Sequence, residues 1–175
     1  MGDLTILPMN QKYAFEILQW RYPKPYDFYN IYYSNHALSE LLEENYFAVV
    51  NQNNGLVGFF CTGRSSQVPS GVLVKAYEND CTDVGLGIKP HLTGRGNGYD
   101  FCSFIFSYIQ KQKTSQTSLR LTVATFNQRA IRLYKKLGFI KDKQFHHHQI
   151  EFMTMVKPFE KESIIVHFIG KEIIL

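Results

Sequence analysis

The sequence has no apolar run that approaches the roughly 20 residues needed to cross a bilayer. Its first residues, MGDLTILPMNQ, lack the basic start and apolar stretch of a signal peptide, and Ile6 stands where a myristoylation site needs Ser or Thr. We therefore expect no membrane association.

Cysteine is also scarce, with three residues and no C-x-x-C spacing: Cys61, Cys81 and Cys102. An odd, sparse set is typical of reduced thiols, so we expect a cytoplasmic protein without a disulfide framework.

The sequence also lacks a large excess of one charge, because 19 basic and 15 acidic residues leave a formal net charge of only +4. Proteins that bind nucleic acid usually carry a clustered basic stripe, which this sequence lacks, so we expect no nucleic-acid partner. A mild positive charge instead suits a small anionic ligand. The 175 residues, of which 45% are apolar, are enough for one domain with a hydrophobic core.

Metal-ligand spacing is missing too. His146, His147 and His148 are adjacent, but neighbouring strand residues face opposite sides, so at most His146 and His148 share a face. No cysteine or acid stands at ligand spacing near them, and we expect no metal site. Cys102 lies in an apolar stretch, where a free cysteine usually packs, so we assign it no nucleophilic role.

Turn and cap signals divide the sequence into a mixed α/β pattern. The tetrapeptide QNNG separates two β-rich stretches and predicts a hairpin, because Asn and Gly tolerate positive φ. Asn10 and Asn127 stand where helix N-caps are expected, and Gly138 stands where a helix would end. The predicted strands are 3–7, 46–51, 56–63, 81–90, 119–125, 139–144 and 149–156; the predicted helices are 11–20, 99–113 and 128–137, with one helical turn at 39–44 and a polar loop at 64–80.

The segment GIKPHLTGRGNGYDF, residues 87–101, is rich in glycine and has no acid before Asp100. It joins a predicted strand to a predicted helix, whose unpaired N–H groups and dipole favour an anion. Gly94, Gly96 and Gly98 have no Cβ and let the backbone approach a phosphate closely. The segment lacks the Lys-Ser or Lys-Thr of a P-loop, and both its G-x-G-x-G spacing and its position in the middle of the sequence differ from the dinucleotide-binding fingerprint. The alternative is a turn that only reverses the backbone direction.

Two stretches together resemble the GNAT N-acetyltransferase superfamily. DVGLGIKPHLTGRGNGYDFC resembles its acetyl-CoA-binding core, Q/R-x-x-G-x-G/A, although Thr93 stands at the first motif position. NQRAIRLYKKLGF resembles the second signature, which ends in Y-x-x-x-G-F. The resemblance covers about Tyr46 to Val156. It implies an α/β (α+β) fold with a mixed, mostly antiparallel central sheet of about seven strands flanked by about four helices, in a single domain over 1–157 followed by an apolar C-terminal extension over 158–175.

The resemblance also implies which residues bind the acetyl-CoA co-substrate. In the family, main-chain amides of the glycine turn hold the diphosphate, and the end of the preceding strand pairs with the pantetheine arm. An amide of that strand also tends to hold the thioester carbonyl, and Asn127 matches an asparagine that bonds pantetheine. The implied coenzyme-binding residues are Leu86, Gly87, Ile88, Gly94, Arg95, Gly96, Asn97, Gly98, Tyr99 and Asn127.

Two residues are candidates for the chemistry. Tyr134 matches the family tyrosine that protonates the leaving thiolate, and a phenol with a pKa of about 10 is protonated at neutral pH. The alternative is an aromatic ring packed on a core-facing helix. Asp83 is the candidate general base, because family members often use an acid on the strand before the turn, sometimes through a water. The alternatives are a water alone, or an aspartate that belongs to a polar network.

The resemblance therefore implies an N-acetyltransferase in which a small-molecule or peptide amine attacks acetyl-CoA directly in a ternary complex, without a metal. A coenzyme A-binding or sensing module without turnover is one alternative, and it would not need Tyr134. A nucleotide-phosphate binder is another, and it would bind ATP more tightly than coenzyme A. The aromatic segment WRYPKPYDFYN, residues 20–30, is expected beside the acceptor, where Trp20, Tyr22, Tyr26 and Tyr29 either line the site or pack together. The apolar tail is compatible with a homodimer.

Overall fold

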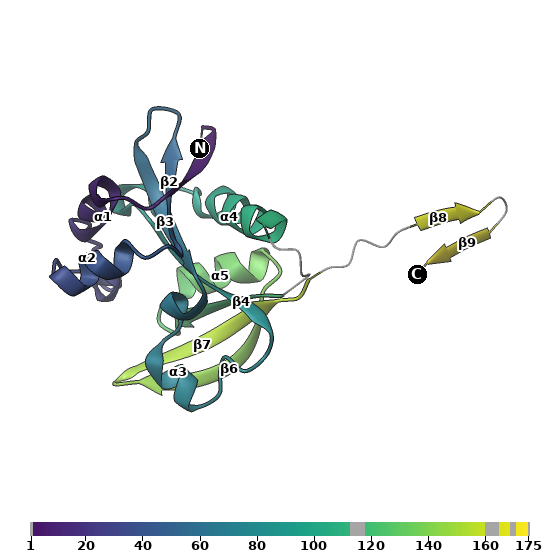
Figure 1. The fold of residues 1–175 in the computed structure, drawn as a ribbon. Helices are drawn as coiled ribbons and strands as arrows, with labels where there is room; N and C mark the ends of the chain where they lie inside the picture. Colours follow the sequence, from purple (N-terminus) through teal and green to yellow (C-terminus); the bar gives the residue numbers. More distant parts are fainter. Residues whose placement is uncertain (1, 113–117, 160–164, 169–170, 175) are drawn as a thin grey trace.

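A computed structural model describes residues 2–112, 118–159, 165–168 and 171–174 of the protein. Its strands are β1 (Leu4–Pro8), β2 (Tyr46–Asn51), β3 (Leu56–Thr62), β4 (Cys81–Ile88), β5 (Ser118–Ala124), β6 (Ile140–His147), β7 (Ile150–Lys157), β8 (Ile165–Phe168) and β9 (Lys171–Ile174). Its helices are α1 (Gln11–Leu18), α2 (Asn35–Leu41), α3 (Pro69–Leu73), α4 (Gly98–Gln112) and α5 (Gln128–Lys136), with short 3-10 turns η1 (Tyr26–Tyr29), η2 (Gly63–Ser66) and η3 (Pro90–Leu92) (Figure 1).

Seven strands form one mixed sheet, as expected, and their order in it is β1-β2-β3-β4-β5-β7-β6. Neighbouring strands are antiparallel except β4 and β5, which run parallel. The parallel register extends from Cys81↔Ser118 to Val84↔Leu121, whereas β3 stays paired with β4 as far as Ile88. Beyond Val84, the edge of β4 that faces β5 therefore has no partner strand among the described residues. The candidate active site lies at this gap between β4 and β5.

Local signals explain where several elements begin and end. The Asn10 side chain accepts a hydrogen bond from the Tyr13 amide and caps α1, and the Asn127 side chain caps α5 through the Ala130 amide. Gly138 follows α5 with φ of +89°, a conformation that favours glycine. Both predicted caps and the predicted stop are confirmed.

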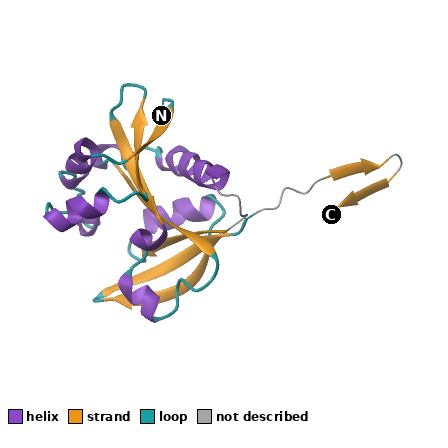
Figure 2. Ribbon diagram, in the orientation of Figure 1, coloured by secondary structure: helices purple, strands orange, loops and turns teal. Residues whose placement is uncertain are grey.

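The helices cover the two faces of the sheet in separate groups (Figure 2). On one face, Tyr13 and Ile17 of α1 and Leu41 of α2 share a buried cluster with β2 and β3. On the other face, α4 and α5 pack on the sheet through a second cluster that includes Phe101 and Ile131. The gap between β4 and β5 therefore lies between two hydrophobic layers, within reach of both.

Several predicted boundaries are wrong, among them those of the polar loop, of the single helical turn and of the fourth strand. Residues 64–80 are not a continuous loop, because Pro69 starts the short helix α3, a position where its fixed φ fits and its missing N–H costs nothing. The helical turn expected at 39–44 begins earlier, at Asn35, because Ser34 caps it by accepting from the Ala37 amide. The fourth strand ends at Ile88, two residues before Pro90.

The described parts of the C-terminal tail form a two-stranded sheet of their own. β8 pairs with β9 in antiparallel register from Ile165↔Ile174 to Phe168↔Lys171. The domain boundary at residue 157 and a role of the tail in a homodimer stay predictions. Among the described residues, no helix combines the length and the apolar character that a membrane span requires.

Candidate active site

A cavity of about 950 Å³ opens where β4 and β5 separate. Residues 85–88 of β4 and 121–123 of β5 line its middle. One end is lined by the glycine turn and by α5, and the other end by α1 and by Glu40 of α2. The aromatic segment after α1 reaches both ends, because its Tyr26 and Tyr29 contact Arg129 and Asn127 at the start of α5. The cavity therefore joins the two faces of the sheet through the gap between the strands.

The main chain of β4 presents polar groups to this cavity. The Lys89 amide donates to the Val57 carbonyl of β3 at 2.9 Å. Because the hydrogen-bonding direction alternates along a strand, the N–H and C=O groups of Ile88 and Leu86 point to the opposite edge, toward the gap. The Tyr22 hydroxyl donates to the Ile88 carbonyl at 2.8 Å. The rest of this edge can pair with an extended ligand that carries amides.

The glycine turn holds two residues in conformations that favour glycine. Gly94 has φ of +73° and Gly96 has φ of +80°, and a Cβ on Gly96 would meet no protein atom within 4 Å. The Thr93 hydroxyl donates to the Pro90 carbonyl and the Asn97 amide group donates to the Leu92 carbonyl, so side chains within the turn fix its shape. An open, glycine-lined turn at the start of the 15-residue helix α4 is a suitable anion site.

Gly98 has a different reason to lack a side chain. A Cβ there would lie 2.9 Å from Cδ2 of Leu133, so this glycine allows α4 to pack closely against α5.

Most of the predicted coenzyme-binding residues line the cavity: Leu86, Gly87, Ile88, Gly94, Gly96, Gly98, Tyr99 and Asn127. Arg95 and Asn97 are not among the lining residues, and Asn97 instead braces the turn.

Two cations at this end of the cavity were not predicted from the sequence. Arg129 lines the cavity, and its Nη1 lies 3.8 Å from the place where a Cβ of Gly94 would stand. Its guanidinium also lies 4.3 Å from the Tyr26 ring centroid, a cation–π contact. Lys136 lines the cavity too, with its ammonium 5.1 Å from the Tyr99 ring centroid. An arginine in the first turn of a helix opposes the helix dipole, and that mismatch was a sequence signal for an anionic neighbour.

Tyr134 lies in the wall of the cavity on α5, with 8% of its surface exposed. Burial raises the pKa of its phenol well above the usual value, so the hydroxyl keeps its proton at neutral pH. No hydrogen bond joins this hydroxyl to another described residue, which leaves it able to donate to a ligand. Asn127 lines the cavity nearby, and its side-chain amide donates to the Tyr29 hydroxyl at 3.2 Å.

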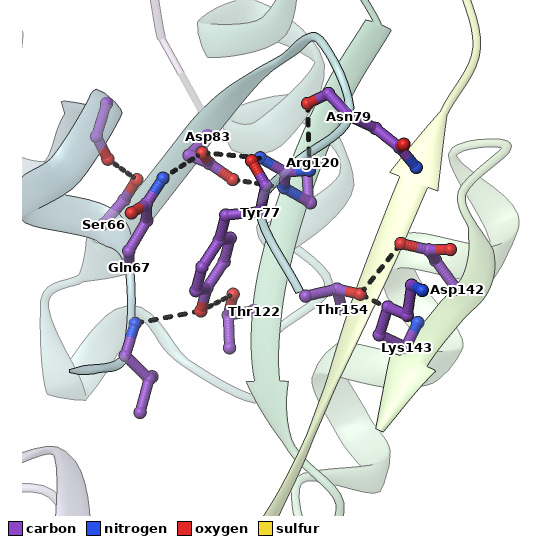
Figure 3. A network of polar contacts seen from close by, with 12 residues as sticks. Ser66, Gln67, Tyr77, Asn79, Asp83, Arg120, Thr122, Asp142, Lys143 and Thr154 are labelled. Carbon is purple, nitrogen blue, oxygen red and sulfur yellow. Dashed lines mark hydrogen bonds and ion pairs between the residues drawn. The ribbon is translucent and has the colours of Figure 1, made fainter. Parts of the chain in front are cut away.

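Asp83 lies in a buried polar network and not in the cavity wall (Figure 3). Arg120, its direct partner in the β4–β5 register, binds it with two hydrogen bonds, Nε to Oδ1 at 2.5 Å and Nη2 to Oδ2 at 2.9 Å. Gln67 donates to Oδ2 at 2.6 Å. Two further Arg120 N–H groups donate to the carbonyls of Tyr77 and Asn79. This geometry favours a structural role for Asp83 over the predicted role as base.

The aromatic segment reaches the cavity, which is one of the two predicted alternatives, and its place beside an acceptor stays a prediction. Trp20, Tyr22, Tyr26 and Tyr29 all line the cavity.

The histidine run lies apart from the lining residues, where His147 Nδ1 is 2.7 Å from the Ser70 hydroxyl. Within the described residues, no group of three or more His, Cys, Asp or Glu side chains could hold a metal ion. Burial raises the pKa of the Cys102 thiol to about 12, which keeps it protonated and unreactive.

Comparisons with known proteins agree with this geometry. Residues 12–139 match the model of the acetyltransferase (GNAT) family. A comparison with curated proteins found no match.

Three solved structures illustrate the shared fold. A chimera of the Vibrio cholerae spermidine N-acetyltransferase SpeG and hSSAT is 18% identical, with a TM-score of 0.68 over 90% of this protein and 96% of the chimera. An acetyltransferase (GNAT family) from Bacillus anthracis is 13% identical, with a TM-score of 0.68 over 92% and 98% of the two proteins. The ribosomal-protein-S18-alanine N-acetyltransferase from Escherichia coli is 17% identical, with a TM-score of 0.62 over 95% and 100%.

Proposed function

Because the protein belongs to the acetyltransferase (GNAT) family, we propose that it transfers the acetyl group of acetyl-CoA to a primary amine, by direct attack in a ternary complex. One observation carries the proposal. The free edge of β4 leads through η3 into a glycine turn at the start of α4, so one cavity offers both amide partners and anion-binding N–H groups. Pantetheine carries amides and the nucleotide end of coenzyme A carries a diphosphate, which matches both parts.

The two parts of the cavity would bind the coenzyme differently. Main-chain amides between Gly94 and Tyr99 would hold the diphosphate, aided by the α4 dipole and by the charge of Arg129. The pantetheine arm would pair with Leu86 and Ile88 as an added strand and bond to Asn127. Since the Tyr22 hydroxyl already bonds the Ile88 carbonyl, Tyr22 would mark where this pairing stops.

Acetyl-CoA supplies an activated acetyl thioester, and the protein supplies positions and protons. The Ile88 amide would donate to the thioester oxygen and stabilise negative charge that develops there. Tyr134, kept protonated by burial, would give its proton to the departing sulfur and recover it from solvent. Because three donors already occupy the Asp83 carboxylate, we propose that water takes the proton from the attacking amine.

The test is thiol release on mixing the protein with acetyl-CoA and a panel of primary amines, beside calorimetric titration with coenzyme A. We expect saturable coenzyme binding and thiol release with at least one amine. Coenzyme binding without release for every amine would favour the non-catalytic coenzyme A-binding module. No coenzyme binding, or tighter binding of ATP than of coenzyme A in a thermal-shift comparison, would contradict the proposal.

A further inference from the structure

The charged residues that line the cavity are divided between its two ends. Arg129 and Lys136 lie at the end formed by the glycine turn and α5. Glu40, at the opposite end, is the one carboxylate among the described lining residues. Two other carboxylates near the cavity already have cationic partners, because Asp83 binds Arg120 and Glu16 binds Lys89. Glu40 therefore provides the negative charge that faces an incoming acceptor.

The structure holds this carboxylate in place beside β4. The Tyr46 hydroxyl donates to Oε1 of Glu40 at 3.1 Å. The Tyr46 ring stacks on Phe59, with ring centroids 6.4 Å apart. A Cβ on Gly87 would lie 2.5 Å from the Phe59 ring, so that ring covers the face of the β4 segment that presents the reactive edge. Glu40 is thus linked through two aromatic rings to the segment where the acetyl group would be held.

The surroundings of Glu40 are apolar and aromatic. Trp20 packs on Phe59 with ring centroids 5.9 Å apart, and Ile17 and Ile31 line the same end of the cavity. A second ammonium on the acceptor would find no second carboxylate among the described lining residues. Burying a charge without a partner is costly, so this end disfavours polyamines and aminoglycosides.

Trp20 adds a directional requirement. It is 6% exposed and lines the cavity, and its Nε1 is the one buried side-chain nitrogen or oxygen of the described residues that has no hydrogen-bond partner. An unpaired buried donor is unfavourable unless a ligand satisfies it. An acceptor that carries an oxygen near its apolar body would provide that partner.

Resting on the function proposed above, we propose that the acceptor is a primary monoamine with an apolar body. Glu40 binds its amino group as the ammonium, which loses one proton to water before its lone pair attacks the thioester. The rings of Trp20 and Phe59 contact its apolar part, and the Trp20 indole N–H donates to an oxygen when the acceptor has one. Amides of apolar amino acids combine all three features. The free amino acids do not fit, because their carboxylate would be repelled by Glu40.

Matched acceptors test this class. Hexylamine and 1,6-diaminohexane have the same length and differ by one amine, and we expect kcat/KM to be at least about tenfold higher for hexylamine. Phenylalanine amide should be a better acceptor than phenethylamine, and Trp20→Phe should abolish that difference. A diamine or spermidine that is acetylated as fast as hexylamine, or faster, would overturn the inference and leave the proposed function standing.

Glu40→Gln tests the ammonium contact itself. Gln keeps an oxygen that can accept from Tyr46, so we expect the fold and coenzyme affinity to persist while KM for hexylamine rises at least about tenfold. Glu44→Gln, an exposed carboxylate outside the cavity lining, is the matched control and should leave KM unchanged. An unchanged KM in Glu40→Gln would overturn the assignment.

A binding measurement separates this inference from the proposed function. Trp20 is the only tryptophan in the sequence, so intrinsic fluorescence reports directly on this end of the cavity. Titration with hexylamine should change that fluorescence in the wild type and require at least about tenfold more amine in Glu40→Gln. Amine binding without thiol release would reject the proposed function and keep the subsite, whereas no saturable fluorescence change with any monoamine would reject the subsite.

Discussion

The two halves of β4 have opposite surroundings. Before Val84, β4 is joined to β5 and its Asp83 is held by Arg120 in a buried ion pair. After Val84, the same strand faces a cavity, and the main-chain groups of Leu86 and the N–H of Ile88 are left for a ligand, whereas the Ile88 carbonyl already accepts from Tyr22. A buried ion pair is costly to desolvate and must be well bonded to persist. One strand can thus combine a fixed, satisfied half with an open, binding half.

The buried network lies directly beside the point at which the strands part. Asp83 and Arg120 are register partners one residue before the last paired residues, Val84 and Leu121. Tyr77 extends the network, because its carbonyl accepts from Arg120 and its hydroxyl lies 3.0 Å from that of Thr122, which lines the cavity (Figure 3). We expect changes in the closed half to alter stability first and changes in the open half to alter binding and rate first.

The largest expected effect comes from removing one partner of the Asp83–Arg120 ion pair. Arg120→Met leaves the Asp83 carboxylate buried without its cation, and we expect a loss of about 3–5 kcal/mol in the free energy of unfolding. Chemical denaturation monitored by circular dichroism measures this loss. A loss below about 1 kcal/mol would show that the closed half does not depend on the pair.

The double variant Asp83→Leu/Arg120→Met is the matched control for that change. It removes both charges, and replacement of a buried pair by apolar residues is often close to neutral, so most of the lost stability should return. If Asp83 has only a structural role, the folded double variant keeps kcat within about threefold of wild type, since no reacting group is removed. A folded double variant without activity would instead support Asp83 as the base.

Tyr134→Phe tests the cavity beside the open half of β4. The variant removes a hydroxyl that bonds to no described residue, so we expect the melting temperature to stay the same. Loss of a general acid should lower kcat by about 100-fold, with the coenzyme dissociation constant unchanged. Stopped-flow or steady-state thiol release measures kcat, and calorimetry measures binding. A kcat near that of wild type would remove Tyr134 from the chemistry.

Gly96→Ala tests the glycine turn against a matched glycine outside it. Gly63 has φ of +73° and Gly96 has φ of +80°, and a Cβ on either would meet no protein atom within 4 Å. Both alanine variants should therefore lose about 1–2 kcal/mol of stability from the strained φ alone. Only Gly96→Ala should also weaken coenzyme A binding, by about tenfold, because its methyl group enters the anion site. Equal coenzyme affinity in the two variants would contradict the assignment of the turn.

The smallest expected effect is the response of kcat to alkaline pH. In the proposed mechanism the protonated form of Tyr134 is the active acid, so activity through this group should fall only as the pH passes the pKa of Tyr134 in the folded protein. Burial raises that pKa above the ordinary value of about 10, so Tyr134 should cause no decline in kcat between pH 7 and about 10. A pH profile of kcat for wild type, with Tyr134→Phe as the reference, checks this. A decline centred near pH 8 that is absent from the variant would contradict it.

Features that depend on neighbouring residues could be predicted from the sequence. The caps at Asn10 and Asn127, the hairpin around QNNG, the glycine turn and the two family motifs are local, because a cap or a positive φ is a property of a few adjacent residues. These local signals were enough to predict the fold and the family.

Contacts between distant side chains depend on the three-dimensional fold and could not be predicted in this way. Arg120 lies 37 positions after Asp83, and sheet register makes them partners, so a residue that looked like a base is held in an ion pair. Glu40 and Arg129 have no motif of their own, and they line the cavity only because α2 and α5 converge on the gap between β4 and β5. Burial and pairing, which set the charge and reactivity of a side chain, arise from that convergence.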